Sequence, residues 1–171
     1  SDAGTPLLSD PGRLLIQKCI QENINIVPIP GVSSITSSMS ISGFKDQFLF
    51  YGFLPKTENE LEKTLSSLSK FSFSQIFFIP SIKINLYLKK FKIYFHGRKV
   101  LIAKEMTKLH EYFYRSNIDD ISMFKSPIKG ELTVVISENN TKEKFLDEDK
   151  IKKKAKQFLK KYSLKDVVEL L

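Results

Sequence analysis

The sequence predicts an α/β fold, and two observations carry that prediction. Short apolar segments with strand character alternate with amphipathic helical segments along most of the 171 residues, an order that is typical of sheets covered by helices. Hydrophobic residues make up 42% of the chain, which is enough for a buried core. The sequence contains no run of about 18 apolar residues, so we expect a soluble chain without a transmembrane helix.

The charge and the cysteine content narrow the possible partners of the chain and its expected cellular location. Lys and Arg number 27 against 19 Asp and Glu, which gives a formal net charge of +8. This excess favours an anionic partner such as nucleic acid, although lysines that are merely solvated at the surface give the same count. The one cysteine, Cys19, excludes an internal disulfide and a cysteine metal site. We therefore expect no metal and a reducing, cytoplasmic location.

Residues 1–43 begin with the densest turn chemistry of the sequence. The opening stretch SDAGTPLLSDPG combines Gly, Pro, Ser and Asp, and is typical of a ligand loop that ends at a helix start. Asp10 is expected to cap that helix, with Pro11 at its first position and apolar spacing as far as Asn23. A strand is then expected at 25–31. The small residues of 31–43 predict a helix that packs tightly or approaches a ligand closely.

The rest of the chain repeats the alternation. Strand patterns are short runs rich in Val, Ile, Phe and Tyr, whereas helical patterns place apolar residues three or four positions apart. Strands are expected at 47–55, 74–80, 99–105, 111–116 and 130–138, with 111–116 at a sheet edge. Helices are expected at 58–68, 82–95 and 118–124.

Two boundaries divide the chain into three predicted parts. A turn at 43–46 precedes a second set of strands and helices, and the polar stretch 139–149 precedes a lysine-rich segment. We expect 1–44 to be the C-terminal part of a first α/β domain, because so short a unit seldom folds alone. Residues 45–140 then form a second α/β domain. Residues 141–171 form a basic helical extension that begins a truncated C-terminal module.

Five motifs occur in a characteristic order and spacing. They are SDAGTPLLSDPG, PGVSSITSSMSISG, FLFYGFLP, AKEMTKLHEYFYR and KGELTVVI. Together they resemble the ribosomal RNA small-subunit methyltransferase I branch of the tetrapyrrole methylase superfamily. The resemblance implies two α/β domains, the first incomplete here, with S-adenosylmethionine in the cleft between them. It also implies methyl transfer to the ribose 2′-oxygen of a cytidine in the decoding region, and it is compatible with a homodimer.

The resemblance and the residue types together select the cofactor-binding candidates. A loop that holds a cofactor must bring backbone close to it, which glycine and tight turns permit. Small hydroxyls can then hold the amino-acid head of the cofactor. The candidates are Gly4, Thr5, Leu8, Ser34, Ile35, Met106, Thr107, Gly130 and Glu131. The alternative is a set of structural turns beside a tightly packed helix.

The same motifs contain two candidate catalytic residues. A ribose hydroxyl is a poor nucleophile until its proton leaves, so a general base or a nearby cation is expected. Alignment of oxygen, methyl and sulfur supplies much of the remaining rate. Glu105 and Lys108 follow a predicted strand, where open α/β sheets place ligands, and ordinary solvated charges are the alternative. His110 and His96 are interpreted as surface or turn residues.

Two departures from the family pattern concern the substrate more than the cofactor. Relatives usually carry Tyr-Glu-Ser-Pro-His-Arg where this chain has Phe-Ile-Pro-Ser-Ile-Lys at 78–83, and KTENELEK at 56–63 replaces a basic run. Two other functions therefore stay open. One is methylation of a small acidic tetrapyrrole, which would need the same cofactor cleft. The other is RNA binding by a homologue that has lost catalysis.

The lysine-rich segment 151–162 is predicted to be an amphipathic helix. Apolar residues recur at helical spacing, and lysines occupy most other positions. Such lysines can neutralise RNA phosphates and give a salt-dependent affinity that is independent of sequence. A solvated helix face is the alternative.

Overall fold

The computed structural model describes residues 4–125, 128–139 and 159 of the chain. The chain divides into two compact units, Ser1–Asn139 and Asn140–Leu171. The expected boundary at 44/45 falls inside the first unit. The predicted helix at 151–162 lies, except for Leu159, outside the described residues, so its lysines stay a prediction.

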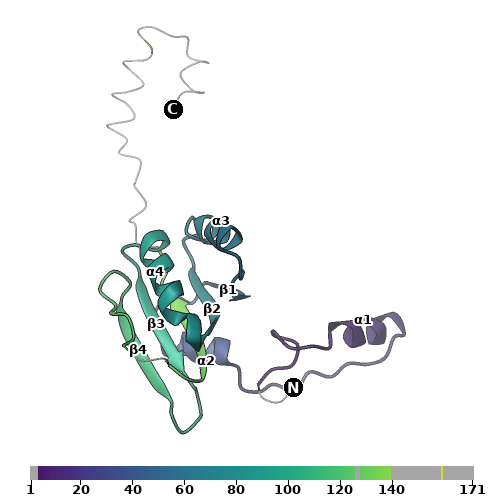
Figure 1. Cartoon of the computed structure of the whole chain (residues 1–171). Coiled ribbons are helices and arrows are strands. Elements are labelled where there is room, and N and C mark those ends of the chain that lie inside the picture. The colour runs from purple at the N-terminus through teal and green to yellow at the C-terminus, as the bar shows by residue number, and fades with distance from the viewer. Residues whose placement is uncertain (1–3, 126–127, 140–158, 160–171) are drawn as a thin grey trace. The chain divides into compact units, whose positions relative to one another are not determined.

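A sheet of five strands forms the centre of the first unit (Figure 1). The order across the sheet is β1-β2-β5-β3-β4, so the predicted edge position of the strand near 111–116 is confirmed. β1 and β2 are parallel, whereas β5 is antiparallel to both β2 and β3. The carboxyl ends of β1, β2 and β3 therefore lie at one edge with the amino end of β5. The strands are β1 (Phe48–Phe53), β2 (Ser74–Pro80), β3 (Lys99–Lys104), β4 (Tyr112–Asn117) and β5 (Glu131–Ile136).

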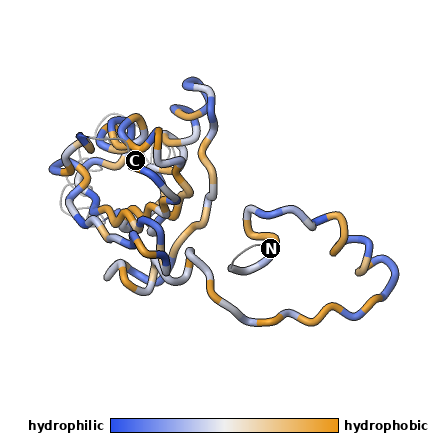
Figure 2. The backbone as a smooth tube through the Cα atoms, turned by 60° about the horizontal axis from the view of Figure 1, so that its bottom comes forward, coloured by the Kyte–Doolittle hydropathy of each residue, from blue (hydrophilic) through white to orange (hydrophobic). Residues whose placement is uncertain are grey.

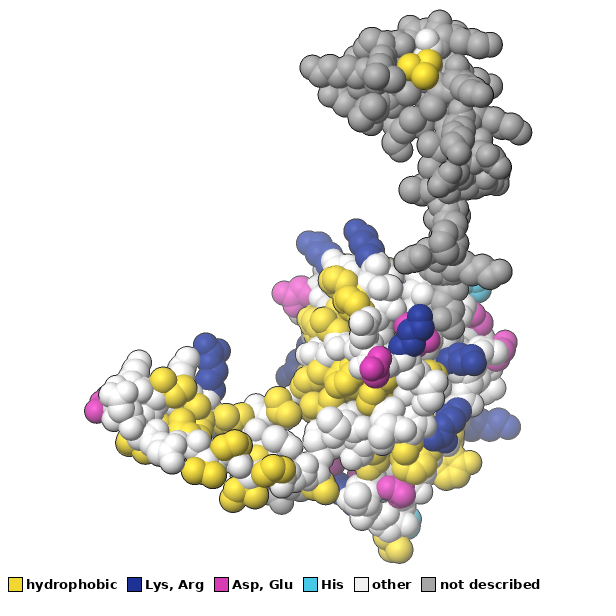
Figure 3. All heavy atoms as spheres, turned by 180° about the vertical axis from the view of Figure 1, so that it is seen from behind, with side chains coloured by type: hydrophobic (Ala, Val, Ile, Leu, Met, Phe, Trp, Pro, Cys, Tyr) yellow, Lys and Arg dark blue, Asp and Glu magenta, His cyan; other side chains and the backbone are white. Residues whose placement is uncertain are grey.

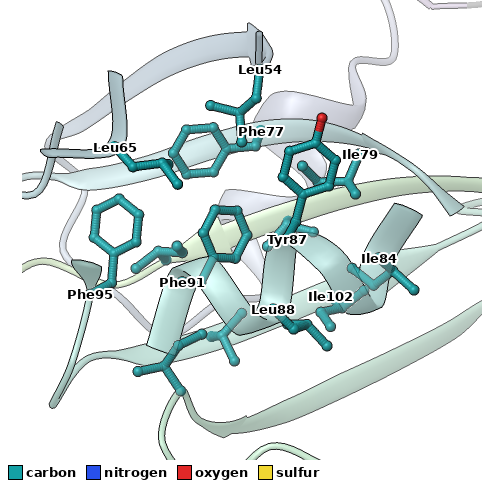
Figure 4. Close-up of a cluster of buried hydrophobic side chains, with 14 of the residues drawn as sticks. Leu54, Leu65, Phe77, Ile79, Ile84, Tyr87, Leu88, Phe91, Phe95 and Ile102 are labelled. Carbon is teal, nitrogen blue, oxygen red and sulfur yellow. The ribbon is translucent and has the colours of Figure 1, made fainter. Parts of the chain in front are cut away.

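Helices α3 (Glu58–Leu68) and α4 (Ile84–Tyr94) cover one face of the sheet, and a short 3₁₀ turn, η1 (Ser81–Lys83), leads into α4. Period-2 alternation sends one set of strand side chains to this face, where they meet the apolar faces of the helices. Figure 4 shows Phe77 of β2 next to Phe91 of α4 in this cluster. Phe77 and Phe91 have no exposed surface, and their ring centroids lie 5.5 Å apart. The predicted α/β class is confirmed.

Helix α2 (Ser34–Ser40) covers the opposite face. Ile35 and Met39 pack against Ile76, Leu101 and Val135, which are the strand neighbours of the residues that face α3 and α4. The small side chains of α2 permit this approach, because a buried serine folds back onto its own helix. The Ser38 hydroxyl donates to the Ile35 carbonyl at 3.0 Å and is fully buried. The predicted tight packing of this helix is therefore present.

Residues 4–33, which we call the N-terminal arm, differ from the sheet in how little of their surface is buried. They include α1 (Arg13–Gln21), in which no residue is buried. Hydrophobic residues recur along the arm in Figure 2, and many of their side chains are visible on its surface in Figure 3. Leu14 is 80% exposed. The helix has Gly12 at its N-cap and no side-chain cap hydrogen bond, so the prediction that Asp10 caps it is wrong.

Two other predicted elements are also wrong. Residues 25–31 form no strand, because all the strands of the described chain lie between 48 and 136 and pair with one another. Pro28 and Pro30 additionally lack the N–H that a ladder needs. The predicted helix at 118–124 is a turn and an irregular segment.

Hydrogen bonds to distant residues hold the segment 118–124 at Ile118 and at Phe124. The Ile118 N–H donates to the Arg98 carbonyl at 2.8 Å. The Asn85 amide both donates to the Phe124 carbonyl and accepts from the Phe124 N–H, at 2.9 Å each. These contacts hold the backbone against α4 and the start of β3. Within the described residues, no helix is long and apolar enough to span a membrane.

Candidate functional site

A cavity of about 420 Å³ opens at the sheet edge where β1, β2 and β3 end. Its volume is within the range of roughly 300–1,000 Å³ that is usual for small-molecule sites. Ligands of open α/β sheets bind at this edge. Its lining comes from the arm, from α2 and from the strand ends, and comprises Gly4, Thr5, Leu8, Ser9, Asp10, Ser33, Ser34, Ile35, Phe53, Phe78, Ile79, Pro80, Ala103, Met106, Gly130, Glu131, Leu132 and Thr133.

The arm contributes a loop with an unusual backbone. Gly4 has φ 76°, and a Cβ built on it would lie 3.4 Å from the Val32 carbonyl oxygen. The Thr5 hydroxyl donates to the same carbonyl at 3.2 Å, so both ends of the arm meet beside the cavity. Leu7 and Ser9 also have positive φ, at 70° and 67°. Such conformations are uncommon for residues other than glycine and concentrate at functional sites.

The strand ends give the cavity a largely apolar floor. Ile79, Ala103 and Leu132 are buried, and Met106 is half-buried just beyond the end of β3. The polar residues around this floor include the hydroxyl residues of the arm loop, Ser34, and the acidic residues Asp10 and Glu131. A cavity with an apolar floor and a few polar groups suits a ligand that is partly aromatic and partly polar.

Beside the cavity, Glu105, Lys108 and Glu131 form a hydrogen-bonded network. The Lys108 ammonium lies 3.0 Å from Glu131 Oε2 and 3.3 Å from Glu105 Oε1. The Glu131 N–H donates to the same Glu105 oxygen at 2.8 Å, and the Glu105 N–H donates to the Glu131 carbonyl at 3.0 Å. The network therefore ties the turn after β3 to the start of β5.

These contacts set the charge states in the network. The backbone hydrogen bond from Glu131, and after it the contact with Lys108, lowers the pKa of the Glu105 carboxyl. Hydrogen bonds to Glu131 and then to Glu105 raise the pKa of the Lys108 ammonium. Both groups are charged at neutral pH. A carboxylate with a lowered pKa is a weaker base, and Glu105 Oε1 already accepts hydrogen bonds from Lys108 and from the Glu131 N–H.

Gly130 leaves open the space that the Glu105 side chain occupies. Gly130 has φ 102°, and a Cβ built on it would overlap the Glu105 side chain. Glu105 itself has φ 49° and Thr107 has φ 65°. The turn after β3 thus bends sharply, and it brings the Glu105 carboxylate against the backbone of β5. Only glycine at 130 leaves room for this arrangement.

The structure brings most of the predicted cofactor residues to one cavity. Gly4, Thr5, Leu8, Ser34, Ile35, Met106, Gly130 and Glu131 line it. Thr107, Glu105 and Lys108 do not line it. The Thr107 N–H donates to Glu111 Oε2 at 2.7 Å, and Lys108 reaches the cavity only through its contact with Glu131.

Sequence reasoning missed the aromatic part of the lining. Phe53 ends β1, and Phe78 lies near the end of β2. Their position at the carboxyl ends of two parallel strands was the available signal. His96 lies in a turn as interpreted, with Nδ1 2.8 Å from Asp119 Oδ1, and His110 is exposed.

Comparison with known proteins identifies the family of the chain. The model of the family described as Tetrapyrrole (Corrin/Porphyrin) Methylases matches residues 1–122. The chain belongs to the tetrapyrrole methylase family. The matched residues include the arm, α2 and the turn after β3, whereas the start of β5 lies beyond them.

Curated relatives of this tetrapyrrole methylase carry a more specific name. A protein of *Thermotoga maritima* named ribosomal RNA small subunit methyltransferase I is 41% identical over 141 residues, which are 80% of this chain and 63% of that protein. A *Rickettsia prowazekii* protein of the same name is 37% identical over 142 residues, covering 81% of this chain and 51% of its own length. The chain thus spans between half and two thirds of these relatives.

Solved structures share the fold at low sequence identity. The methyltransferase CobJ superposes with a TM-score of 0.59 at 17% identity, over 80% of this chain and 62% of that chain. A uroporphyrin-III C-methyltransferase from *Thermus thermophilus*, complexed with S-adenyl homocysteine, gives 0.54 at 12% identity, over 78% and 62%. At these identities the likeness establishes the fold of the family.

Proposed function

We propose that this protein is an S-adenosylmethionine-dependent methyltransferase that modifies ribosomal RNA of the small subunit, at the ribose 2′-oxygen of a cytidine in the decoding region. The observation that carries the proposal is that one cavity collects residues from motifs far apart in the sequence, from Gly4 to Glu131. The names of the relatives at 41% and 37% identity support the substrate.

The cavity fits S-adenosylmethionine in size and in chemistry. The cofactor has an adenine, a ribose and a charged amino-acid head, and the cavity offers an apolar floor, two acidic residues, Asp10 and Glu131, and small hydroxyls. We assign Met106 and Leu132 to the adenine and thioether parts, and the Glu131 carboxylate to a hydroxyl of the cofactor ribose. Thr5 and Ser34 hydroxyls, with the backbone around Gly4, hold the amino-acid head.

The charged network performs the remaining part of the reaction. S-adenosylmethionine, when bound, would supply an activated methyl group on its sulfonium. The ribose oxygen would bond to that methyl carbon as the carbon–sulfur bond breaks, S-adenosylhomocysteine would be the leaving group, and the hydroxyl proton would pass to solvent. We assign the Lys108 ammonium to the ribose oxygen, where a fixed positive charge favours the developing negative charge. Glu105 orients Lys108 and the start of β5 through the contacts at 3.3 Å and 2.8 Å.

A methyl-transfer assay tests the proposal. The purified protein is incubated with methyl-labelled S-adenosylmethionine and small ribosomal subunits, and the RNA is digested to nucleosides for mass spectrometry. We expect labelled 2′-O-methylcytidine. Label on a base would correct the position, whereas label on an added porphyrinogen and none on RNA would favour a tetrapyrrole methylase. RNA binding without any transfer would identify a homologue without catalysis.

A pair of glycine variants tests the cofactor site. Gly4→Val places a branched side chain at φ 76° beside the Val32 carbonyl, next to the cavity. We expect cofactor binding weaker by at least about 1 kcal/mol, on the scale of backbone strain. Gly43→Val is the control, because Gly43 also has a positive φ of 71° but has no atom within 4 Å of its built Cβ. Calorimetry that gives equal affinities for the two variants would contradict the assignment.

A further inference from the structure

The Phe53 ring lies at the rim of the cavity with much of its surface uncovered. It lines the cavity, yet the residue is 59% exposed, whereas the other aromatic lining residue, Phe78, is half-buried. We propose that Phe53 is a stacking surface for an unpaired nucleobase of the RNA substrate. The inference rests on the proposed function, since it names a recognition element for the same reaction.

A β-bulge aims Phe53 at the cavity. The pairing of β1 with β2 shifts between Phe50 and Gly52, so Phe50 pairs with Ile76, Gly52 with Phe77 and Phe53 with Phe78. Without the extra residue, alternation would send Phe50 and Phe53 to opposite faces. With it, both rings lie on the face that carries α2 and the cavity. Gly52 has φ 81°, which allows the bulge.

The neighbouring rings fix Phe53 and leave it accessible. Its centroid lies 5.5 Å from that of Phe78 at an interplanar angle of 63°, and Phe50 lies 5.0 Å from the same ring. Edge-to-face contacts of this kind are favourable and hold a ring in one orientation. Phe53 therefore has a fixed ring beside the cavity, which is what a stacking partner for a planar group requires.

Single-stranded RNA is the partner that suits an exposed ring on a basic protein. Proteins recognise unpaired bases chiefly by stacking them on aromatic side chains, and positive charge attracts the backbone. The chain has a formal net charge of +8. A cofactor bound at the cavity floor, by contrast, would be in contact with Ile79, Ala103 and Leu132, all of which are buried.

The absence of tryptophan from the sequence makes a direct test available. Phe53→Trp introduces a single indole at the rim, and Phe73→Trp introduces one as a control. Phe73 is similarly placed at the surface, 39% exposed and 6.3 Å from the Phe71 ring, but it precedes β2 and so lies at the opposite edge of the sheet. Each variant is titrated with a single-stranded RNA that carries the decoding-region sequence, and separately with S-adenosylmethionine.

We expect RNA to quench the fluorescence of Phe53→Trp and to leave Phe73→Trp unchanged. Phe53→Ala should bind the RNA at least about tenfold more weakly and keep its affinity for S-adenosylmethionine, because stacking is lost and the cavity floor is intact. Phe53→Tyr should restore RNA binding.

The outcomes separate this inference from the proposed function. If Phe53→Trp is quenched by S-adenosylmethionine alone, or if Phe53→Ala binds RNA like the unmodified protein, the inference is overturned while methyl transfer to RNA can still be observed. If RNA quenches Phe53→Trp but no methyl group reaches RNA, Phe53 still binds RNA, while the proposed function, and with it the role of Phe53 in substrate recognition, is overturned. If RNA neither quenches Phe53→Trp nor receives a methyl group, both the stacking inference and the proposed function are overturned.

Discussion

The sheet and the N-terminal arm use their hydrophobic residues in different ways. In the sheet, the central residues of β2, β3 and β5 are buried on both faces by α2, α3 and α4. In the arm, α1 has no buried residue although its apolar spacing is helical. The arm nevertheless supplies Gly4, Thr5 and Leu8 to the cavity. The sheet is thus held by its core, whereas the arm has no such core and contributes loop residues to the site.

The largest expected effect on stability comes from truncating a buried side chain in the core of the sheet. Phe77→Ala removes a ring with no exposed surface from the cluster around α4, and should lower the free energy of unfolding by about 3–5 kcal/mol. Leu14→Ala, at a residue that is 80% exposed, should change it by no more than about 0.5 kcal/mol. Urea denaturation followed by circular dichroism measures both. Similar losses for the two variants would show that α1 is packed in solution.

An intermediate effect on stability is expected at Gly130, where the Glu105 side chain connects the turn after β3 to the start of β5. Gly130→Ala forces the Glu105 side chain away and breaks its hydrogen bond with the Glu131 N–H. Gly97→Ala is the control, because Gly97 has φ 75° and open space around its built Cβ. The control should lose about 1 kcal/mol from backbone strain, and Gly130→Ala should lose more and also bind the cofactor less tightly. Equal unfolding midpoints and equal calorimetric affinities would show that the Glu105 position is unimportant.

The smallest effect concerns pH. The Glu105 carboxyl has its pKa lowered from an ordinary 4.5 by the hydrogen bond from the Glu131 backbone. Its ionised form therefore stabilises the folded state above about pH 4.5, and this contribution is lost as the pH falls through the lower pKa of the folded protein. Glu105→Gln should flatten the fall of the unfolding temperature below that pH.

The matched variant for this pH experiment is Glu22→Gln in the arm. The Glu22 carboxylate lies 2.6 Å from the Lys18 ammonium, and both side chains are exposed. Exposed pairs of this kind contribute little to stability, so this variant should follow the unmodified protein. A Glu105→Gln profile that also follows it would mean that the network beside the cavity contributes no stability in acid.

Local sequence periodicity was sufficient to predict the helices and strands whose apolar faces pack against one another in the core. The bounds of α3 and β2 agree with their predicted ranges, 58–68 and 74–80, because turns flank them and the core buries their apolar faces. The strand at 25–31 was predicted from the same kind of pattern and failed, because a strand also needs a neighbour. The segment 118–124 is held at Ile118 by a hydrogen bond to Arg98 and at Phe124 by hydrogen bonds to Asn85, distant residues that no local pattern contains.

The site was predictable to the extent that its residues belong to recognisable motifs. Gly4, Ser34, Met106 and Glu131 were selected from separate stretches, and the structure places them around one cavity. The position of Phe53 was not predictable from alternation, because the bulge before Gly52 reverses the expected face. The ordering role of Glu105 depends on its contact with the backbone of β5, which only the tertiary structure reveals.

Hydrogen exchange with and without S-adenosylmethionine tests most directly whether the arm and the sheet edge together form a cofactor site. Mass spectrometry of the exchanged peptides should show slower exchange at 4–10 and at 130–133, because the bound cofactor would join the arm loop to the start of β5. Exchange in α3 and α4, on the far face of the sheet, should not change. Unchanged exchange throughout, or protection confined to α3 and α4, would contradict the account.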